Sequence, residues 1–122
     1  MGKSKMLFKF LSLGIIVALF SSCATCATSY RKNLTEKPQL SEANNSYKKA
    51  IHWAAKGDCE IRPFQAREYY RKAESYLSDA IFKLEQLGHD NKIDVSEELY
   101  YCKNLKGEIH EDIVKAEKAM LP

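Results

Sequence analysis

The feature that most limits the fold is a heptad repeat of apolar residues that begins shortly after Pro63 and ends just before Gly88. Steps of four and three residues alternate without a break through Ala66, Tyr70, Ala73, Leu77, Ala80, Leu84 and Leu87. This spacing lines the side chains along one side of an α-helix, and alanine at every seventh position lets a second helix approach closely. Proline suits the first turn of a helix and glycine its end. The pattern therefore predicts a helix from Pro63 to Gly88 with a partner packed against it.

Residues 41–57 show a shorter apolar stripe of the same kind, again with alanine at regular positions. Their apolar stripe steps by four, three and four residues through Ala43, Tyr47, Ala50 and Ala54. Ser41 is a candidate N-cap, and Gly57 offers a left-handed residue to end the helix. A short connection between two alanine-striped helices favours an antiparallel hairpin.

A third helix is predicted from Asp94, which has the spacing of a capping box with Glu97. The heptad register then continues, with a break at Lys106 that Leu105 can cover, through Val95, Leu99, Cys102, Ile109, Ile113, Ala116 and Met120. Alternation with a period of two never persists, so no strand is expected. The prediction is an all-α fold, in which an antiparallel helical hairpin is extended to a three-helix bundle over residues 41–122.

The N-terminus has the layout of a secretory signal. A lysine-rich start is followed by an apolar run from Phe10 to Phe20 and then by small residues. The run is about 16 Å long as a helix, too short for a hydrocarbon core of about 30 Å. Three of the 19 basic residues lie in the first nine positions, and the rest of the chain carries 16 basic and 16 acidic residues. The net charge of +3 therefore belongs to the leader, and no nucleic-acid partner is expected.

The end of this leader resembles the lipobox of bacterial lipoproteins, since residues 19–23 read LFSSC. The resemblance implies a signal peptide over residues 1–22, a diacylglycerol (palmitate-bearing) anchor on Cys23, and a place in the bacterial cell envelope. Ala24 implies no retention in the inner membrane, which favours the outer membrane where there are two. Two alternatives stay open: cleavage after Ala27, which leaves a soluble exported protein, and an uncleaved membrane anchor.

Residues 23–40 show no sustained apolar period and include Pro38. We expect a flexible linker between the lipidated N-terminus and the bundle domain.

The region from Ala50 to Leu77 resembles a family of uncharacterised alanine-rich envelope lipoproteins with a helical hairpin. The resemblance rests on Ala50, Ala54, Lys56-Gly57, Pro63, Ala66 and Ala73. It implies an envelope lipoprotein of unknown role, with no catalytic residues to transfer. Residues 69–76, YYRKAESY, also look like part of a tetratricopeptide helix, which would imply an adaptor that binds a partner peptide or helix.

Sites of catalysis or metal binding find little support in the residue pattern. His52, His89 and His110 lie on three different segments, without the paired spacing that holds a metal. Cys59 and Cys102 would lie about 25 Å apart in the bundle, beyond the limit of about 7 Å for a disulfide. Cys102 is expected to pack as a small apolar residue, whereas Cys59 could pair with Cys26 or between chains. No enzyme activity, cofactor, metal or small-molecule substrate is expected.

Aromatic residues beside the helix seams are the remaining candidates for a functional surface. They either pack the third helix on the hairpin or form an exposed strip that binds an envelope partner: Trp53, Tyr69, Tyr76, Tyr100 and Tyr101. The expected function is that of a small exported, membrane-anchored lipoprotein with a non-enzymatic structural or accessory role. The alternative is the tetratricopeptide-like adaptor.

Overall fold

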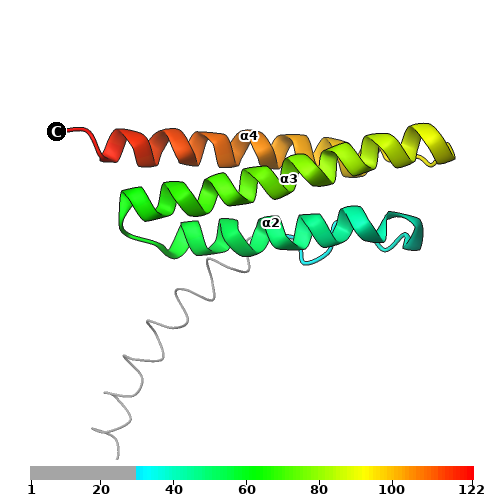
Figure 1. Ribbon diagram of the computed structural model, residues 1–122, viewed down its shortest axis with the longest axis horizontal. Coiled ribbons are helices and arrows are strands. Elements are labelled where there is room, and N and C mark those ends of the chain that lie inside the picture. Colours follow the sequence, from blue (N-terminus) through cyan, green and yellow to red (C-terminus); the bar gives the residue numbers. More distant parts are fainter. Residues whose placement is uncertain (1–29) are drawn as a thin grey trace, which may run out of the picture.

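Three long antiparallel helices, α2, α3 and α4, build the protein, with α3 packed between the other two (Figure 1). The computed structural model describes residues 30–122, so Cys23, Cys26 and the predicted signal lie outside the described residues. A short 3₁₀ helix, η1 (Pro38–Leu40), leads directly into α2 (Ser41–Cys59), which is followed by α3 (Pro63–Asn91) and α4 (Ser96–Ala119). The structure has no strand over residues 30–122. The predicted all-α three-helix bundle is confirmed.

The heptad seam forms the core as its spacing predicts. Ala73, Leu77, Ala80 and Leu84 of α3 are fully buried, and so are the alanines of the α2 stripe. In α4, Leu105 is buried beside the break at Lys106 and keeps the apolar face continuous. Close-packed alanines leave no room for larger side chains, so these positions set the distance between the helices.

Both glycines that were expected to end helices lie inside them instead. Gly57 is buried within α2, and a Cβ atom there would lie 2.6 Å from a Tyr70 ring carbon. Gly88 lies within α3, where a Cβ would lie 2.7 Å from a methyl group of Val95. Each glycine is therefore needed for the close approach of a neighbouring side chain rather than for a left-handed turn. The left-handed residue that ends α3 is Lys92, with φ of 53°.

The predicted helix starts also need correction. Ser41 does not cap α2, because the chain enters that helix from η1, and Leu40 occupies the N-cap position without a side-chain bond. Helix α4 starts at Ser96 rather than at Asp94. The Asp94 carboxylate accepts hydrogen bonds from the backbone N–H and the hydroxyl of Ser96, at 3.1 and 2.6 Å.

The described part of the expected linker, residues 30–40, is packed against the bundle instead of forming a flexible tether. Leu34 and Leu40 are buried in the core. The backbone N–H of Leu34 donates to the Asn44 side chain of α2 at 2.7 Å. The sequence pattern concealed this packing because two isolated leucines produce no periodic signal.

Candidate interaction surface

Residues 30–37 cross between α2 and α4, in what we call the α2–α4 groove. Tyr47 of α2, which is fully buried, donates a hydrogen bond to the backbone carbonyl of Arg31 at 2.6 Å. Its hydroxyl lies 3.2 Å from that of Tyr101 on α4, and the Arg31 guanidinium stacks 4.5 Å from the centre of the Tyr101 ring. This network ties α2, α4 and the N-terminal segment together. Tyr101, a candidate docking residue, is thus engaged within the molecule.

Asp58, on the last turn of α2, holds the other end of this segment. One carboxylate oxygen accepts a hydrogen bond from the Tyr30 hydroxyl, and the other accepts one from Tyr70 of α3 at 2.6 Å. Burial, together with the neighbouring Asp58 carboxylate, raises the pKa of Tyr30 above its ordinary value. Burial likewise raises the pKa of Tyr47. Both phenols are therefore held neutral, as hydrogen-bond donors.

Ion pairs fix the same segment to the start of α4. The Lys37 ammonium lies 3.2 Å from the Glu98 carboxylate and donates to the backbone carbonyl of Asp94 at 2.9 Å. Arg31 lies 3.7 Å from Glu97. Because Glu98 is buried, its charge depends on the lysine for compensation. The basic residues of the segment thus meet acidic residues of α4.

A third polar cluster joins α2 to α3. The Ser46 hydroxyl donates to the Asp79 carboxylate at 2.6 Å, and the Lys83 ammonium lies 3.0 Å from both. The hydrogen bonds from Ser46 and from Lys83 lower the pKa of the Asp79 carboxyl below its ordinary value. They tie α2 to α3 at a buried serine where the alanine stripe is interrupted.

Three of the five aromatic candidates lie where α2 meets α3, away from the α2–α4 groove. The rings of Trp53 and Tyr69 lie 5.6 Å apart between centres, and both side chains are half-buried. Tyr76 is 36% exposed and lies further along α3. Tyr100 stands apart on α4 and is 73% exposed. The structure therefore brings Trp53 and Tyr69 together but separates Tyr100 and Tyr101 from them.

Lysines cover this aromatic cluster. The Lys72 ammonium lies 4.2 Å from the centre of the Trp53 ring, and that of Lys56 lies 5.0 Å from the same ring. Lys49 lies 5.7 Å from the Tyr76 ring. A cation over an aromatic face is attracted by the ring quadrupole. The exposed surface over these rings is therefore cationic rather than apolar.

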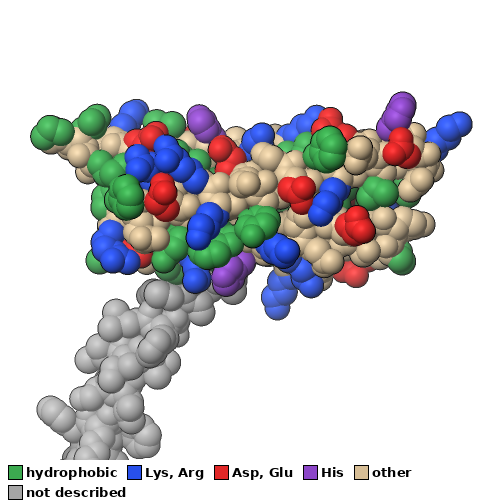
Figure 2. Space-filling view, viewed as in Figure 1, with side chains coloured by type: hydrophobic (Ala, Val, Ile, Leu, Met, Phe, Trp, Pro, Cys, Tyr) green, Lys and Arg blue, Asp and Glu red, His purple; other side chains and the backbone are tan. Residues whose placement is uncertain are grey.

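These lysines belong to a larger surface centred on the outer side of α2, which we call the lysine face: Lys32, Lys48, Lys49, Lys56 and Lys72. In the space-filling view, basic side chains gather along the lower edge of the molecule over α2 (Figure 2). None of the five forms an ion pair within residues 30–122, whereas each of the four arginines in this range does. Between Glu42 and Asp58, α2 carries no acidic residue. The lysine face therefore has positive charge that no ion pair within residues 30–122 neutralises.

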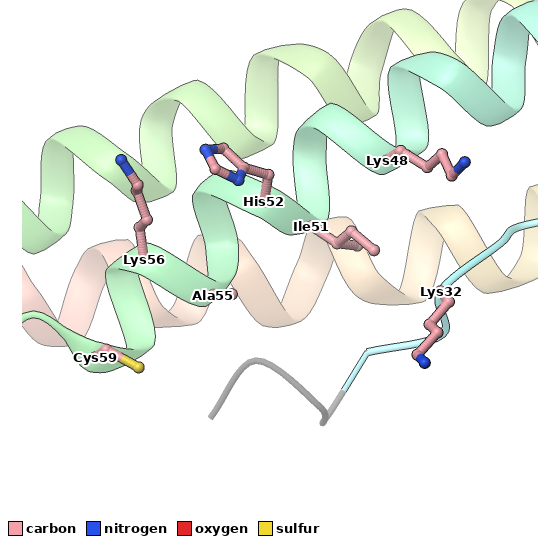
Figure 3. Close-up of a pocket in the computed structure, with 7 residues that line it drawn as sticks. All are labelled: Lys32, Lys48, Ile51, His52, Ala55, Lys56 and Cys59. Carbon is pink, nitrogen blue, oxygen red and sulfur yellow. The ribbon is translucent and has the colours of Figure 1, made fainter. Parts of the chain in front are cut away.

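A shallow depression of about 510 Å³ lies within the lysine face (Figure 3). Lys48, His52 and Lys56 stand on α2, and Lys32 lies on the segment before η1. Ile51 and Ala55 contribute to its floor, and no acidic side chain lines it. The sequence pattern pointed to aromatic residues as the candidate surface, so this lysine surface was missed. The acid-free stretch from Ala43 to Gly57 was the signal that could have found it.

The histidines and cysteines of the described residues do not gather at one site. His110 contacts Glu74, with 3.3 Å between ring nitrogen and carboxylate oxygen, while His52 lies in the lysine face and His89 near the end of α3. Residues 30–122 contain no cluster of three His, Cys, Asp or Glu side chains suited to a metal ion. Cys102 is buried as predicted, and burial raises the pKa of its thiol to about 12. No disulfide joins it to Cys59.

Comparison with protein-family models, with curated proteins and with solved structures finds no match for this chain. Among the helices of residues 30–122, none has the length and apolar character required to cross a membrane.

Proposed function

We propose that this chain is an exported lipoprotein of the bacterial cell envelope, anchored through acylated Cys23, whose bundle has a non-enzymatic structural or accessory role. The leader pattern and the lipobox-like residues 19–23 support export and acylation. The observation that carries the proposal furthest is the packing of residues 30–37 in the α2–α4 groove. Because of this packing, a part of the chain held against the bundle lies within seven positions of Cys23.

This packing leaves little slack between the proposed anchor and the fold. Six residues lie between Cys23 and Tyr30, and the seven steps from one Cα to the next span at most about 25 Å. A bundle attached in this way stays close to the membrane that holds it. In a cell with two membranes, the outer membrane is the proposed location.

The use of polar groups in the bundle supports a structural role. Tyr47, Asp58 and Glu98 each join one helix to the N-terminal segment, and Ser46 joins α2 to α3. Buried polar groups that are bound to one another specify a single arrangement of the helices. These groups hold the bundle together.

The alternative, an adaptor that binds an envelope protein, is favoured by an apolar patch at one end of the bundle. Ile61 and Phe64, at the turn from α2 to α3, are 92% and 58% exposed, and Leu121, after α4, is 70% exposed. Ile61 and Ala119 line the same depression of about 270 Å³. Exposed apolar side chains grouped in this way are typical of protein interfaces. A photo-crosslinker at position 64 that captures one discrete envelope protein, when the same group at Tyr100 captures none, would favour this function.

The anchor is tested by mass spectrometry of the mature N-terminus. Acylated Cys23 supports the proposal, and a first residue of Thr28 would replace it with soluble export. An intact Met1 or Gly2 end would indicate an uncleaved span. The variant Cys23→Ser should lose the acyl mass, whereas the matched variant Cys26→Ser should keep it.

A further inference from the structure

The lysine face includes Lys32, close to the start of the described residues and to the proposed anchor. Lys32 is nine residues from Cys23 and borders the same depression as Lys48 and Lys56. In Figure 1, α2 lies on the opposite side of α3 from α4. An anchor at Cys23 therefore holds the lysine face within about 30 Å of chain length of the membrane.

The balance of basic and acidic residues also differs between the α2 side and the α4 side of the bundle. Residues 30–59 carry six basic and three acidic residues, whereas α4 carries four basic and six acidic residues. Of the three acidic residues in the first region, Asp58 accepts hydrogen bonds from two tyrosines. An anionic surface therefore attracts the side with α2 and repels the side with α4.

We propose that the lysine face docks on the anionic phospholipid headgroups of the membrane that holds the Cys23 anchor, with α2 lying along the membrane surface. This inference rests on the proposed function, because the anchor supplies the proximity. Two kinds of signal, an acyl anchor and a cluster of basic residues, reinforce each other at membranes. A lysine held at an anionic surface contributes roughly fivefold to partitioning.

Trp53 strengthens the fit to a lipid surface. It is the single tryptophan of the chain, and it lies beneath Lys56 and Lys72 within the lysine face. Tryptophan favours the boundary between headgroups and hydrocarbon. Because it is unique, its fluorescence reports on this face alone.

The test uses the full acylated chain reconstituted in two kinds of vesicle, one of phosphatidylcholine and one of equal parts phosphatidylcholine and phosphatidylglycerol. Each contains a lipid with a nitroxide quencher on its headgroup. We expect stronger quenching of Trp53 in the anionic vesicles. The difference should disappear in about 1 M salt, where the screening length is about 3 Å.

Two triple variants with equal loss of charge separate the lysine face from net charge. The variant K48Q/K49Q/K56Q should lower the quenching in anionic vesicles to the phosphatidylcholine level. The control K92Q/K106Q/K118Q removes three lysines outside the lysine face that also form no ion pair. It should keep the full difference. Equal quenching of the unaltered chain in both vesicles, or equal loss in both variants, would overturn the docking proposal.

Flotation of the same samples distinguishes docking from anchoring. A chain that floats with phosphatidylcholine vesicles but shows no extra quenching in anionic ones keeps its anchor and disproves docking. Flotation only with anionic vesicles, lost in high salt, disproves the anchor and supports docking. A chain that floats with neither kind disproves both.

Discussion

Charged groups on one side of α2 are paired within the described part of the protein, whereas those on the other side are not. In the α2–α4 groove, Arg31 and Lys37 pair with glutamates of α4, and Asp58 accepts hydrogen bonds from two phenols. On the lysine face, five lysines stand without a carboxylate partner in the described residues. A partly buried charge must be compensated inside the protein, whereas an exposed ammonium is compensated by water. The first side is therefore part of the fold, and the second remains available to a ligand.

The largest effect should come from removing the apolar contact that holds residues 30–37 in the groove. Leu34 is 1% exposed, so Leu34→Ala should lower the free energy of unfolding by about 2–5 kcal/mol. The matched control Ile61→Ala, at a side chain that is 92% exposed, should change it by less than about 0.5 kcal/mol. Urea denaturation of both variants measures the difference. Equal, small effects would mean that the segment is a loose tether after all.

The next effect concerns the close approach of Tyr70 to α2. A methyl group at Gly57 would meet the Tyr70 ring at 2.6 Å and displace its hydroxyl from Asp58. Gly57→Ala should therefore destabilise the fold by about 1–3 kcal/mol. Gly107→Ala is the matched control, since a Cβ there meets nothing within 4 Å. It should instead stabilise α4 by about 0.5–1 kcal/mol, so thermal melting temperatures that move in the same direction would contradict the packing.

Alkaline pH should weaken the packing of residues 30–37 in the α2–α4 groove. The pKa values of Tyr30 and Tyr47 are raised in the fold above the ordinary value of 10.0. The unfolded chain loses these protons first, so stability is complete below pH 10 and falls as the pH rises further. The loss is roughly 1.4 kcal/mol per phenol for each pH unit. Tyrosinate absorbance should show late-titrating phenols, with one fewer in Tyr30→Phe; early titration of all seven would contradict it.

The helices could be predicted from the sequence because the residues buried along one side of a helix recur at a regular spacing. The seam from Ala66 to Leu84 and the core role of Cys102 were both readable from spacing alone. The roles of Gly57 and Gly88 were misread, because a glycine that ends a helix and one that admits a neighbouring ring look identical in sequence.

The candidate surface was predictable only in part. Trp53 and Tyr69 were named from their positions beside the seams, and the structure places them in contact. That Tyr101 turns inward depends on Tyr47 and Arg31, which are distant in sequence. The lysine face depends equally on which charges find partners, and helical spacing does not determine that.

The smallest effect should come from the lysine face itself. Because Lys48, Lys49 and Lys56 form no ion pair within the described chain, K48Q/K49Q/K56Q should change the free energy of unfolding by less than about 0.5 kcal/mol. Lys37→Gln removes one lysine instead of three, yet it leaves the buried Glu98 uncompensated and should cost more. Urea denaturation without vesicles compares the two variants. A triple variant less stable than Lys37→Gln would show that the lysine face supports the fold, and the contrast between the two sides of α2 would then be lost.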